Sequence, residues 1–496
     1  MQQFFSKLKN DLPAGLVVFL VAVPLCLGIA AVSGVPAFSG LIAGIIGGIV
    51  VGALSGSSLG VSGPAAGLAV IIFDAIDQMK LSIDETATQD VFVEAFQMFL
   101  LAVVIAGVIQ VILGFINGGI IGYYFPSSVI KGMLSGIGLI IIIKEIPYLF
   151  GVTENKGGIL IESENVAGHA IAHINQFLGN INQGSIIIAA VSMAIFILWE
   201  QDFVKRQAFS TMLSGPLVAV ASSIGLYTIF KGVDGLQLNP EQMVTIPVSS
   251  NFSEFAAQFT SPDFSYLLEP KIYMLALSLA AVASIETLLC SEATDKLDPQ
   301  KRITPVNREL VAQGVGNMLA GLIGALPITA VIVRTSANVN SGSTNRYSAI
   351  FHGFWLLLFV LFFPHVINLI PLSALASILI FVGYKLAKPA LFKEQYHRGL
   401  NAFWPFLFTI VVILLTDLLV GITIGMVVGY MFVLRENYRE SLTVVNEGQD
   451  FLFRFHSQTS FMSKSVLKKK LELVHPNGSV IFDFSNNVFV DNDLLD

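Results

Sequence analysis

The chain has few charged residues and almost no cysteine, and each shortage argues against a class of protein. Only 12% of its 496 residues are Asp, Glu, Lys or Arg, about half of the roughly 25% that is usual in soluble domains. The two cysteines, Cys26 and Cys290, both lie in apolar segments, so a disulfide framework of the secreted kind is not expected. The sequence also lacks a Gly-x-x-x-x-Gly-Lys-Ser/Thr phosphate-binding loop, so it gives no support to ATP-driven pumping by this chain alone.

Basic patches and metal-binding clusters are missing as well. The formal net charge of -7 is spread over acidic loops and a mixed tail, which argues against nucleic acid as a partner. His169 and His173 have the spacing of two metal ligands, but no third ligand lies near them in the sequence. A solvated helical face is the favoured interpretation. We therefore predict no enzyme active site, no catalytic metal and no cofactor.

Long apolar runs are what the sequence does contain. Runs of about 20 residues, the length that crosses a bilayer core, recur from residue 12 to residue 434. The bilayer is therefore the solvent of this chain, which is predicted to be an all-α polytopic membrane protein. Twelve full spans are predicted at residues 12–32, 36–54, 92–116, 122–147, 184–200, 209–231, 271–291, 308–326, 346–364, 370–386, 400–416 and 418–434.

Two further apolar pieces, residues 63–73 and 328–338, are too short to cross the bilayer, and each follows a stretch with Gly and Pro. Irregular backbone at membrane depth is tolerated only where protein or a water-filled cavity surrounds it. Each piece is therefore predicted to be a half-helix. One is third among the first seven segments and the other is third among the last seven. This placement is typical of an inverted-repeat transporter and predicts fourteen segments in a seven-plus-seven repeat.

These segments divide the chain into five parts. Most basic loop residues fall on one side of the fourteen-segment arrangement, and the positive-inside rule assigns that side, with both termini, to the cytoplasm. After residue 436 the pattern becomes that of a soluble α/β domain, which we expect to be incomplete at Asp496. The predicted parts are a cytoplasmic N-terminus (1–11), the first repeat (12–231), an extracytoplasmic loop (232–270), the second repeat (271–436) and the tail (437–496).

The starts of the two half-helices are the first candidate site. A helix start presents unpaired N–H groups and the positive end of the helix dipole, so two starts that meet at mid-membrane can bind an anion. Either junction alone is more typical of an ordinary loop-to-helix connection, whereas the matched pair favours a site. The residues concerned are Gly63, Pro64, Ala65, Ala66, Pro327, Ile328, Thr329 and Ala330.

Four charged residues inside spans have more than one interpretation. Glu286 is the acid deepest inside a predicted span, so it is a candidate site for a sodium ion or a proton, or a structural hydrogen-bonding group. Arg334 follows the second half-helix start by about two turns. It could lend positive charge to an anion, pair with an acid or snorkel to the cytoplasmic interface. For Lys131 and Lys144, near span ends, snorkelling is favoured.

Several stretches of the sequence resemble the SulP family of inorganic anion transporters. The resemblance covers residues 10–436, and the tail resembles the opening of a STAS domain. The matching stretches are DLPAGLVVFLVAVPLCLGIA from Asp11, SGPAAG from Ser62, PSSVIKGMLSGIG from Pro126, and NRELVAQGVGNMLAGLIGALP from Asn307 with the following Arg334, Thr335, Asn338 and Gly342.

The resemblance implies a core domain, made of segments one to four and eight to eleven, that moves against a gate domain. It also implies a homodimer. In this family the anion lies between the starts of segments three and ten, against segments one and eight. Carried over to this sequence, that site comprises Leu25, Ile29, Ala65, Ala66 and residues 328–330.

The resemblance also bears on coupling. Glu286 matches the acidic position of segment eight that serves cation coupling in bicarbonate-type members. Here, however, a glutamate replaces the aspartate of sodium-coupled relatives, and Cys290 stands where a hydroxyl residue helps to hold sodium. Both departures weaken the case for Na⁺ at Glu286 and leave H⁺ as the other coupling ion.

Residues 291–310 resemble a bacterial branch of the family that is often associated with carbonic anhydrases. This implies a transporter in the bacterial inner membrane, with a functional link to a carbonic anhydrase. Bicarbonate is then the first predicted substrate and sulfate the second, carried by secondary active transport with alternating access. An anion exchanger or channel-like protein, and a nucleobase permease of the same architecture, remain as alternatives.

Overall fold

The computed structural model describes most of the chain. His169 and His173 lie outside the described residues, as do Pro476, Asn477 and Gly478, whose sequence is typical of a turn. The described residues are 2–81, 91–152, 181–205, 214–248, 251–416 and 418–439, and in the tail 442–447, 450–455, 457–459, 464–472, 474, 479–485 and 487–490.

Helices make up most of the first half of the chain, and one short strand interrupts them. Each of the spans predicted there overlaps a helix of the structure. The elements are α1 (Gln2–Val32), α2 (Ala37–Ile46), the π-helical turn η1 (Gly47–Val51), α3 (Gly52–Leu54), β1 (Ser62–Pro64), α4 (Ala66–Lys80), α5 (Val91–Phe115), the 3₁₀ turn η2 (Gly118–Tyr124), α6 (Ser127–Leu149), α9 (Gln183–Trp199), α10 (Asp202–Lys205) and α12 (Gly215–Phe230).

The second half repeats this order of long helices around one short strand. The elements are η4 (Pro240–Gln242), α13 (Phe252–Ala256), η5 (Phe264–Leu268), α14 (Pro270–Leu297), α15 (Val306–Leu322), β2 (Ile328–Ala330), α16 (Ile332–Asn340), α17 (Tyr347–Phe362), α18 (Pro364–Ile367), α19 (Leu372–Leu386), α20 (Pro389–His397), α21 (Leu400–Leu415) and α22 (Leu418–Arg439).

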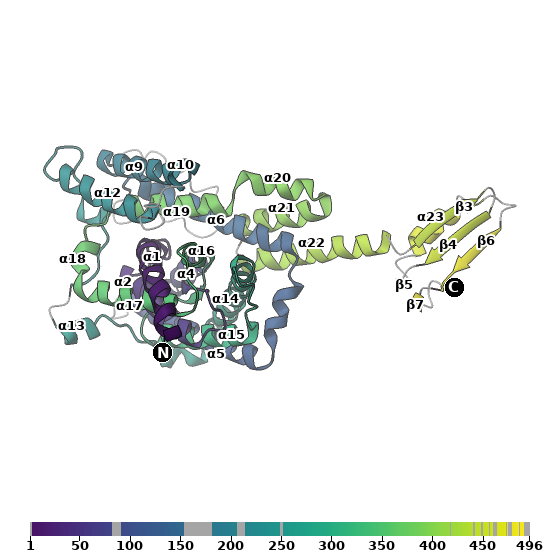
Figure 1. Ribbon diagram of the computed structural model, residues 1–496, viewed down its shortest axis with the longest axis horizontal. Helices are drawn as coiled ribbons and strands as arrows, with labels where there is room; N and C mark the ends of the chain where they lie inside the picture. The colour runs from purple at the N-terminus through teal and green to yellow at the C-terminus, as the bar shows by residue number, and fades with distance from the viewer. Residues whose placement is uncertain are drawn as a thin grey trace.

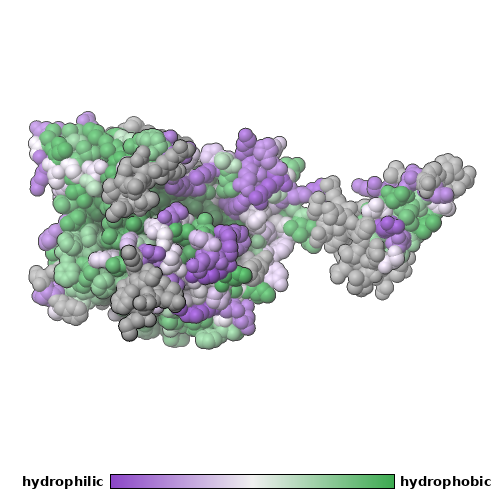
Figure 2. All heavy atoms as spheres, viewed as in Figure 1, coloured by the Kyte–Doolittle hydropathy of each residue, from purple (hydrophilic) through white to green (hydrophobic). Residues whose placement is uncertain are grey.

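Five helical stretches among the described residues are long and apolar enough to cross a bilayer: Asn10–Val32, Ala37–Leu54, Val91–Phe115, Pro270–Leu297 and Leu372–His397. On the face shown in Figure 2, hydrophobic residues cover much of the helical part, while hydrophilic residues gather over α20. A large exposed apolar surface is typical of contact with a membrane. The chain is thus a multi-pass membrane protein, while the fourteen spans, the inverted repeat and the boundaries of the five parts stay predictions.

The helices pack in two groups (Figure 1). In the first helix group, α1, α2, α4, α5 and α14 to α17 pack together, with α5 against α15 and α1 against α17. In the second, α6, α9, α12 and α19 to α22 pack together. The groups touch where α1 meets α12 and α19, and where α4 meets α6. The first helix group contains the segments that the resemblance assigns to the core domain.

Small residues let the helices inside each group approach closely. In the first helix group, a Cβ atom at Gly107 of α5 would lie 2.6 Å from the carbonyl oxygen of Gly314 in α15. In the second, a Cβ atom at Gly138 of α6 would lie 2.5 Å from the carbonyl oxygen of Gly383 in α19. Any larger residue at these glycines would therefore push the helices apart.

The short elements differ from the predicted half-helices at their starts. Residues 62–64 and 328–330 form a buried antiparallel strand pair, with Ser62 opposite Ala330 and Pro64 opposite Ile328. The expectation that a helix begins at residues 327–330 was wrong, because α16 begins at Ile332. Backbone groups buried at this depth need partners, and the two strands supply hydrogen bonds to each other.

The tail has the α/β character that its sequence predicts, with strands β3 (Leu442–Glu447), β4 (Asp450–Phe455), β5 (Ser457–Thr459), β6 (Val480–Asp483) and β7 (Asn487–Val490) and helix α23 (Lys464–Leu471). Strand β4 pairs antiparallel with β3 and parallel with β6, and β5 pairs parallel with β7. In β4 the alternating residues Phe451, Phe453 and Phe455 are buried. Figure 1 shows this tail beyond the end of α22. Its assignment as a STAS domain stays a prediction.

Candidate functional site

The strand pair brings together two parts of the chain that lie far apart in the sequence. Gly63 lies opposite Thr329 in the pair. The pairing continues beyond the strands, because the N–H of Val331 donates to the carbonyl oxygen of Val61 at 2.9 Å. Five of the predicted binding residues, Gly63, Pro64 and residues 328–330, therefore meet in one structure, which we name the strand junction.

The remaining apolar residues of the predicted site lie next to the strand junction. Leu25 and Ile29 are one turn apart on α1 and both are buried, and α1 packs against β1, α4 and α16. Ala65 is the residue before α4, and Ala66 is its first residue. Pro327, directly before β2, is also buried. Ala65, Ala66 and Pro327 thus border the strand junction directly in the chain, and Leu25 and Ile29 lie on a helix that packs against it.

The two helix starts at the strand junction have no side-chain caps. Ala65 precedes α4 and Val331 precedes α16, and both have extended backbones without a capping hydrogen bond from their side chains. The first N–H groups of a helix have no partner within the helix. Two uncapped starts at one strand pair therefore offer donors to an anion.

Arg334 adds a positive charge to this junction. Its side chain is fully buried, with 0% of its surface exposed. Because it is the third residue of α16, the expectation that it follows the helix start by about two turns was wrong. Its Nη2 donates to the Sγ of Cys26 at 3.3 Å. Among the described residues, its Nε and Nη1 groups have no hydrogen-bond partner.

The environment of Arg334 decides between its three interpretations. Its burial excludes snorkelling, and no ion pair joins it to an acid in the described part of the chain. Its Nη1 lies against β1, since a Cβ atom at Gly63 would be 2.0 Å from it. A guanidinium keeps its charge in proteins, and a buried charge without a counter-charge is strongly unfavourable. A charge that faces an anion is the interpretation that stays a prediction.

Glu286 lies at the same junction. It is partly buried on α14, and its Oε2 accepts a hydrogen bond from the Oγ1 of Thr329 at 3.3 Å. Its Oε1 lies beside the start of α4, where a Cβ atom at Gly67 would be 1.7 Å away. The carboxylate therefore touches β2 and reaches α4, so it can respond to both halves of the junction.

The structure does not bring Cys290 to the Glu286 carboxylate by a hydrogen bond. Cys290 is buried one turn further along α14, and its Sγ lies 4.0 Å from the Oγ1 of Thr294. Within the described residues, no three His, Cys, Asp or Glu side chains are grouped as metal ligands would be. Hard cations such as sodium prefer oxygen ligands, so Glu286 and Thr329 are the better donors here.

Sequence reasoning missed the polar residues that fix the strands. The side chain of Asn317 on α15 accepts from the N–H of Ile328 at 2.6 Å and donates to its carbonyl oxygen at 3.0 Å. It also donates to the Oε1 of Gln110 on α5 at 2.7 Å. Asn317 therefore acts on β2 as a neighbouring strand would. Amide side chains inside predicted spans were the signal that could have revealed this role.

Polar residues of α16 hold the chain before β1 in the same way. The Oγ1 of Thr335 accepts from the N–H of Val61 at 3.1 Å, and the Nδ2 of Asn338 donates to the carbonyl oxygen of Leu59 at 2.8 Å. Both side chains are fully buried. The second half of the chain thus supports the backbone of the first half.

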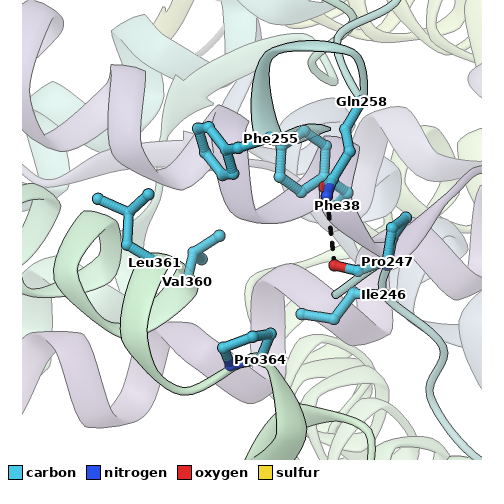
Figure 3. A pocket seen from close by; sticks show the side chains of 8 residues that line it. All are labelled: Phe38, Ile246, Pro247, Phe255, Gln258, Val360, Leu361 and Pro364. Carbon is cyan, nitrogen blue, oxygen red and sulfur yellow. Dashed lines mark hydrogen bonds between the residues drawn. The ribbon is translucent and has the colours of Figure 1, made fainter. Parts of the chain in front are cut away.

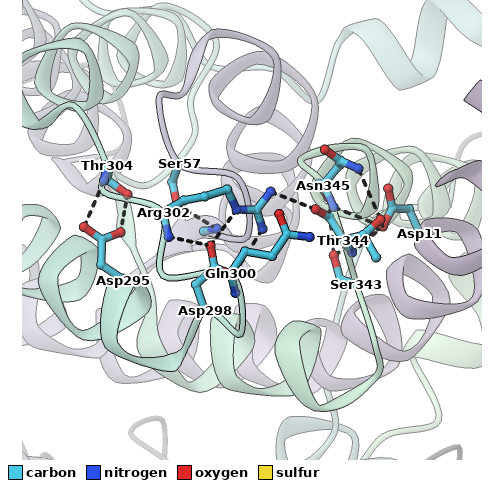
Figure 4. Close-up of polar contacts among 11 residues, drawn as sticks. Asp11, Ser57, Asp295, Asp298, Gln300, Arg302, Thr304, Ser343, Thr344 and Asn345 are labelled. Atoms are coloured by element: carbon cyan, nitrogen blue, oxygen red, sulfur yellow. Dashed lines mark hydrogen bonds and ion pairs between the residues drawn. The ribbon is translucent and has the colours of Figure 1, made fainter. Parts of the chain in front are cut away.

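A polar cluster holds the turn that follows α16 (Figure 4). The Oδ1 of Asp11 accepts from the N–H groups of Thr344 at 2.7 Å and Asn345 at 3.2 Å. Arg302 donates from Nη1 to the Thr344 carbonyl oxygen at 3.0 Å and from Nε to the Oδ2 of Asp298 at 2.6 Å. Burial raises the pKa of Asp298, but the hydrogen bonds and charge of Arg302 outweigh burial and hold that pKa below its usual value. This cluster ties α16 to α1 and to the connection between α14 and α15.

Two lysines for which snorkelling was favoured have acidic partners. Lys131 pairs with Glu394 of α20 at 3.0 Å. Lys144 of α6 lies 3.6 Å from the Oδ1 of Asp74 on α4, and its Nζ lies 4.0 Å from the centre of the Phe73 ring. The Asp74–Lys144 pair therefore joins the two helix groups. Glu145, which sequence reasoning did not consider, is only 2% exposed.

A pocket elsewhere in the first helix group is a poor candidate for the anion site. Apart from Gln258, whose Nε2 donates to the Pro247 carbonyl oxygen at 3.3 Å, its lining is apolar and carries no charge (Figure 3). An inorganic anion gains little from such walls. The lining residues are Phe38, Ile246, Pro247, Phe255, Gln258, Val360, Leu361 and Pro364.

A bundle of apolar helices, interrupted by two paired strands beside a buried guanidinium that has no acidic partner among the described residues, is typical of a multi-pass membrane transporter with broken helices. The model of the sulfate permease family matches residues 8–411, so the chain belongs to the sulfate permease family. This confirms the family resemblance of the sequence. The chain is accordingly a membrane anion transporter of this family and not an enzyme.

Relatives with curated names include transporters of two anions. The chain is 28% identical, over 87% of its length and 74% of the relative, to the "Putative sulfate transporter YvdB" of Bacillus subtilis. It is 25% identical, over 86% of its length and 70% of the relative, to the bicarbonate transporter BicA of a Picosynechococcus species. These names support the class of substrate and leave two anions to choose between.

Solved structures show the same fold. The transmembrane domain of a cyanobacterial bicarbonate transporter, BicA, covers 86% of this chain and 98% of its own, with a TM-score of 0.68 and 22% identity. The murine anion transporter Slc26a9 in its inward-facing state covers 98% of this chain and 82% of its own, with a TM-score of 0.77 and 18% identity. At these identities the likeness establishes the fold alone.

Proposed function

We propose that this protein carries out secondary active transport of a small inorganic anion, with bicarbonate as the first substrate and sulfate as the second. The observation that carries this proposal is Arg334. In the described part of the chain, it is a fully buried guanidinium with two unpartnered nitrogens and no acidic partner. An anion at the strand junction would supply the missing counter-charge.

The junction suits a small anion better than a nucleobase. The residues around the start of α4 are Ala65, Ala66 and Gly67, which are small and offer no side-chain amide. Reading a base needs side-chain donors and acceptors at fixed positions. Uncapped helix starts and one guanidinium instead recognise charge and size.

The number of charges favours bicarbonate over sulfate. One guanidinium balances one negative charge, as bicarbonate carries. Sulfate would bring a second negative charge to the junction at which Glu286 already lies. Like charges in a site of low dielectric constant repel strongly. Bicarbonate would therefore bind with less need for a second cation.

Glu286 is the proposed coupling residue. A proton or a sodium ion there would balance its charge, and the contact with Thr329 would pass that change to β2. The sulfur at Cys290 is a poor ligand for sodium, which favours the proton. We further propose alternating access by movement of the first helix group past the second, a homodimer in the bacterial inner membrane with both termini in the cytoplasm, and a functional link to a carbonic anhydrase.

The test is uptake of radiolabelled bicarbonate and sulfate into proteoliposomes, each with and without an inward sodium gradient and at two external pH values. Concentrative bicarbonate uptake that depends on pH or sodium would support the proposal. Uptake that occurs only into liposomes preloaded with anion would identify an exchanger. Passive flux that follows the membrane potential would identify a channel-like protein, and uptake of a labelled nucleobase alone would overturn the choice of an anion.

A further inference from the structure

Arg334 has one hydrogen-bond acceptor among the described residues, and it is a neutral sulfur. The Sγ of Cys26 accepts from Nη2 at 3.3 Å, and both side chains are fully buried. The sulfur has room because residue 44 of α2 is glycine, where a Cβ atom would lie 2.7 Å from it. Gly63 leaves similar room for Nη1. The guanidinium is thus seated between α1, α2 and β1.

A sulfur acceptor orients a guanidinium without neutralising it. A carboxylate in the same place would form an ion pair with Arg334 and remove the charge that attracts an anion. An apolar side chain would leave a third nitrogen without a partner, and the guanidinium would be free to turn. Cysteine combines a weak acceptor with a compact, apolar body, and both suit this position.

The side chain of Cys26 has a different role from those of Leu25 and Ile29. Those two residues lie one turn apart on α1, and Cys26 is rotated around the helix by about 100° from Leu25 and about 60° from Ile29. Cys26 faces α2, as the close approach of Gly44 to its sulfur requires. Its contact with Arg334 gives it a route to act on an anion without touching it.

We propose that Cys26 is a positioning residue of the anion site, which directs the unpartnered nitrogens of Arg334 and so sets anion affinity. The proposal rests on the proposed function as an anion transporter. It does not follow from the position of Leu25 and Ile29, and it assigns a task to a cysteine for which the sequence suggests only packing.

The experiment measures KM and maximal rate of bicarbonate uptake in proteoliposomes for the full chain and three variants at this position. For Cys26→Ala we expect KM to rise about tenfold with a maximal rate within about twofold of the original, because one hydrogen bond to a charged group is lost. Cys26→Ser, which keeps an acceptor, should recover most of the affinity. Cys26→Asp should abolish uptake, because the new carboxylate would neutralise Arg334.

Two further variants keep the proposal falsifiable. Val32→Ala, at the end of the same helix, removes buried apolar volume about 9 Å along α1 from Cys26. It controls for general loosening of α1, and its KM should not change. Gly44→Ala leaves Cys26 in place but displaces its sulfur, so KM should rise in the same direction even where Cys26→Ala fails to fold. Thermal unfolding of each purified variant reports the fold.

The outcomes separate this proposal from the proposed function. An unchanged KM in Cys26→Ala and Gly44→Ala, while Arg334→Gln loses uptake, would overturn the role of Cys26 and leave anion transport intact. Failure of the unmodified chain to transport any anion would overturn the proposed function itself. Equal loss of affinity in Cys26→Ala and Cys26→Ser would also contradict the proposal, because the serine retains an acceptor.

Discussion

The short helices α4 and α16 both begin at the strand junction, yet they contribute different things to it. Helix α4 has 15 residues, and its first eight, from Ala66 to Phe73, carry no polar side chain. Helix α16 has 9 residues, and its buried side chains are Arg334, Thr335 and Asn338. One helix supplies space at its start, and the other supplies charge and hydrogen bonds.

The two helices also differ in what holds them. Helix α16 is fixed within the first helix group, because Thr335 and Asn338 bind the chain before β1, and the turn after it is held by Asp11. Helix α4 instead reaches the second helix group through Asp74 and Lys144. The comparison teaches that the two short helices differ in function within the fold: α16 contributes charge and hydrogen bonds to the candidate site, and α4 connects the strand junction to the other helix group.

The largest expected effect comes from removing the charge on α16. We expect Arg334→Gln to lower bicarbonate uptake by about 100-fold or more, because a buried charge-assisted hydrogen bond to the anion is lost. Uptake into proteoliposomes measures this effect. Arg308→Gln, at an exposed arginine that donates to the Leu54 carbonyl oxygen, is the matched control and should keep most of the activity. Normal anion affinity in Arg334→Gln would remove α16 as the source of charge.

The next largest effect should come from filling the space at α4. We expect Ala66→Leu to reduce uptake by about tenfold or more while the bundle still folds, because the new side chain would occupy the approach to the uncapped helix start. Ala66→Ser is the control, since it keeps the residue small. Intact uptake by the leucine variant would place the anion elsewhere.

Glu286 contacts β2 and lies beside the start of α4, and its substitution should change coupling more than binding. Glu286→Gln retains an oxygen that can accept from Thr329, so we expect the bundle to fold and the dependence of uptake on pH or sodium to disappear. The measurement is initial uptake rate across pH and across sodium concentration. A variant whose dependence matches that of the unmodified chain would exclude Glu286 from coupling.

A smaller effect is expected on stability from α16. In Thr335→Val the buried N–H of Val61 loses its acceptor, so the free energy of unfolding should fall by about 1 to 3 kcal/mol. Chemical unfolding of the purified protein measures this change. Ser341→Ala, at the residue after α16, removes a partly buried hydroxyl bond to Ala337 and should cost less. Equal losses in both variants would show that Thr335 has no special bracing role.

The smallest effect is expected where α4 meets the second helix group. A partly exposed ion pair contributes about 0.2 to 1 kcal/mol. We therefore expect Asp74→Asn and Lys144→Gln each to lower the maximal rate by about twofold to fivefold, with little change in KM. The exchanged double variant Asp74→Lys with Lys144→Asp should return toward the original rate. Losses that add in the double variant would argue against a direct pairing during transport.

Hydropathy alone determined where the long helices of this protein lie in the sequence. Each predicted span overlaps a helix of the structure, because apolar runs of this length reflect the bilayer and need no knowledge of neighbours. Pro64 and Pro327 marked the two interruptions correctly, since proline removes an N–H group and disfavours a helix in the residue before it. The candidate residues of the junction followed from these signals and from the family resemblance.

Only the tertiary structure decided what those interruptions are. Strands of three residues are too short for a periodic pattern, and their partners lie in opposite halves of the chain, so the pairing of Gly63 with Thr329 left no local signal. The sequence left Arg334 with three interpretations, because burial and the absence of an acidic partner in the described structure depend on helices that are distant in sequence. For the same reason the contacts of Asn317 and Cys26 exist only because α15 and α1 pack against β2 and Arg334.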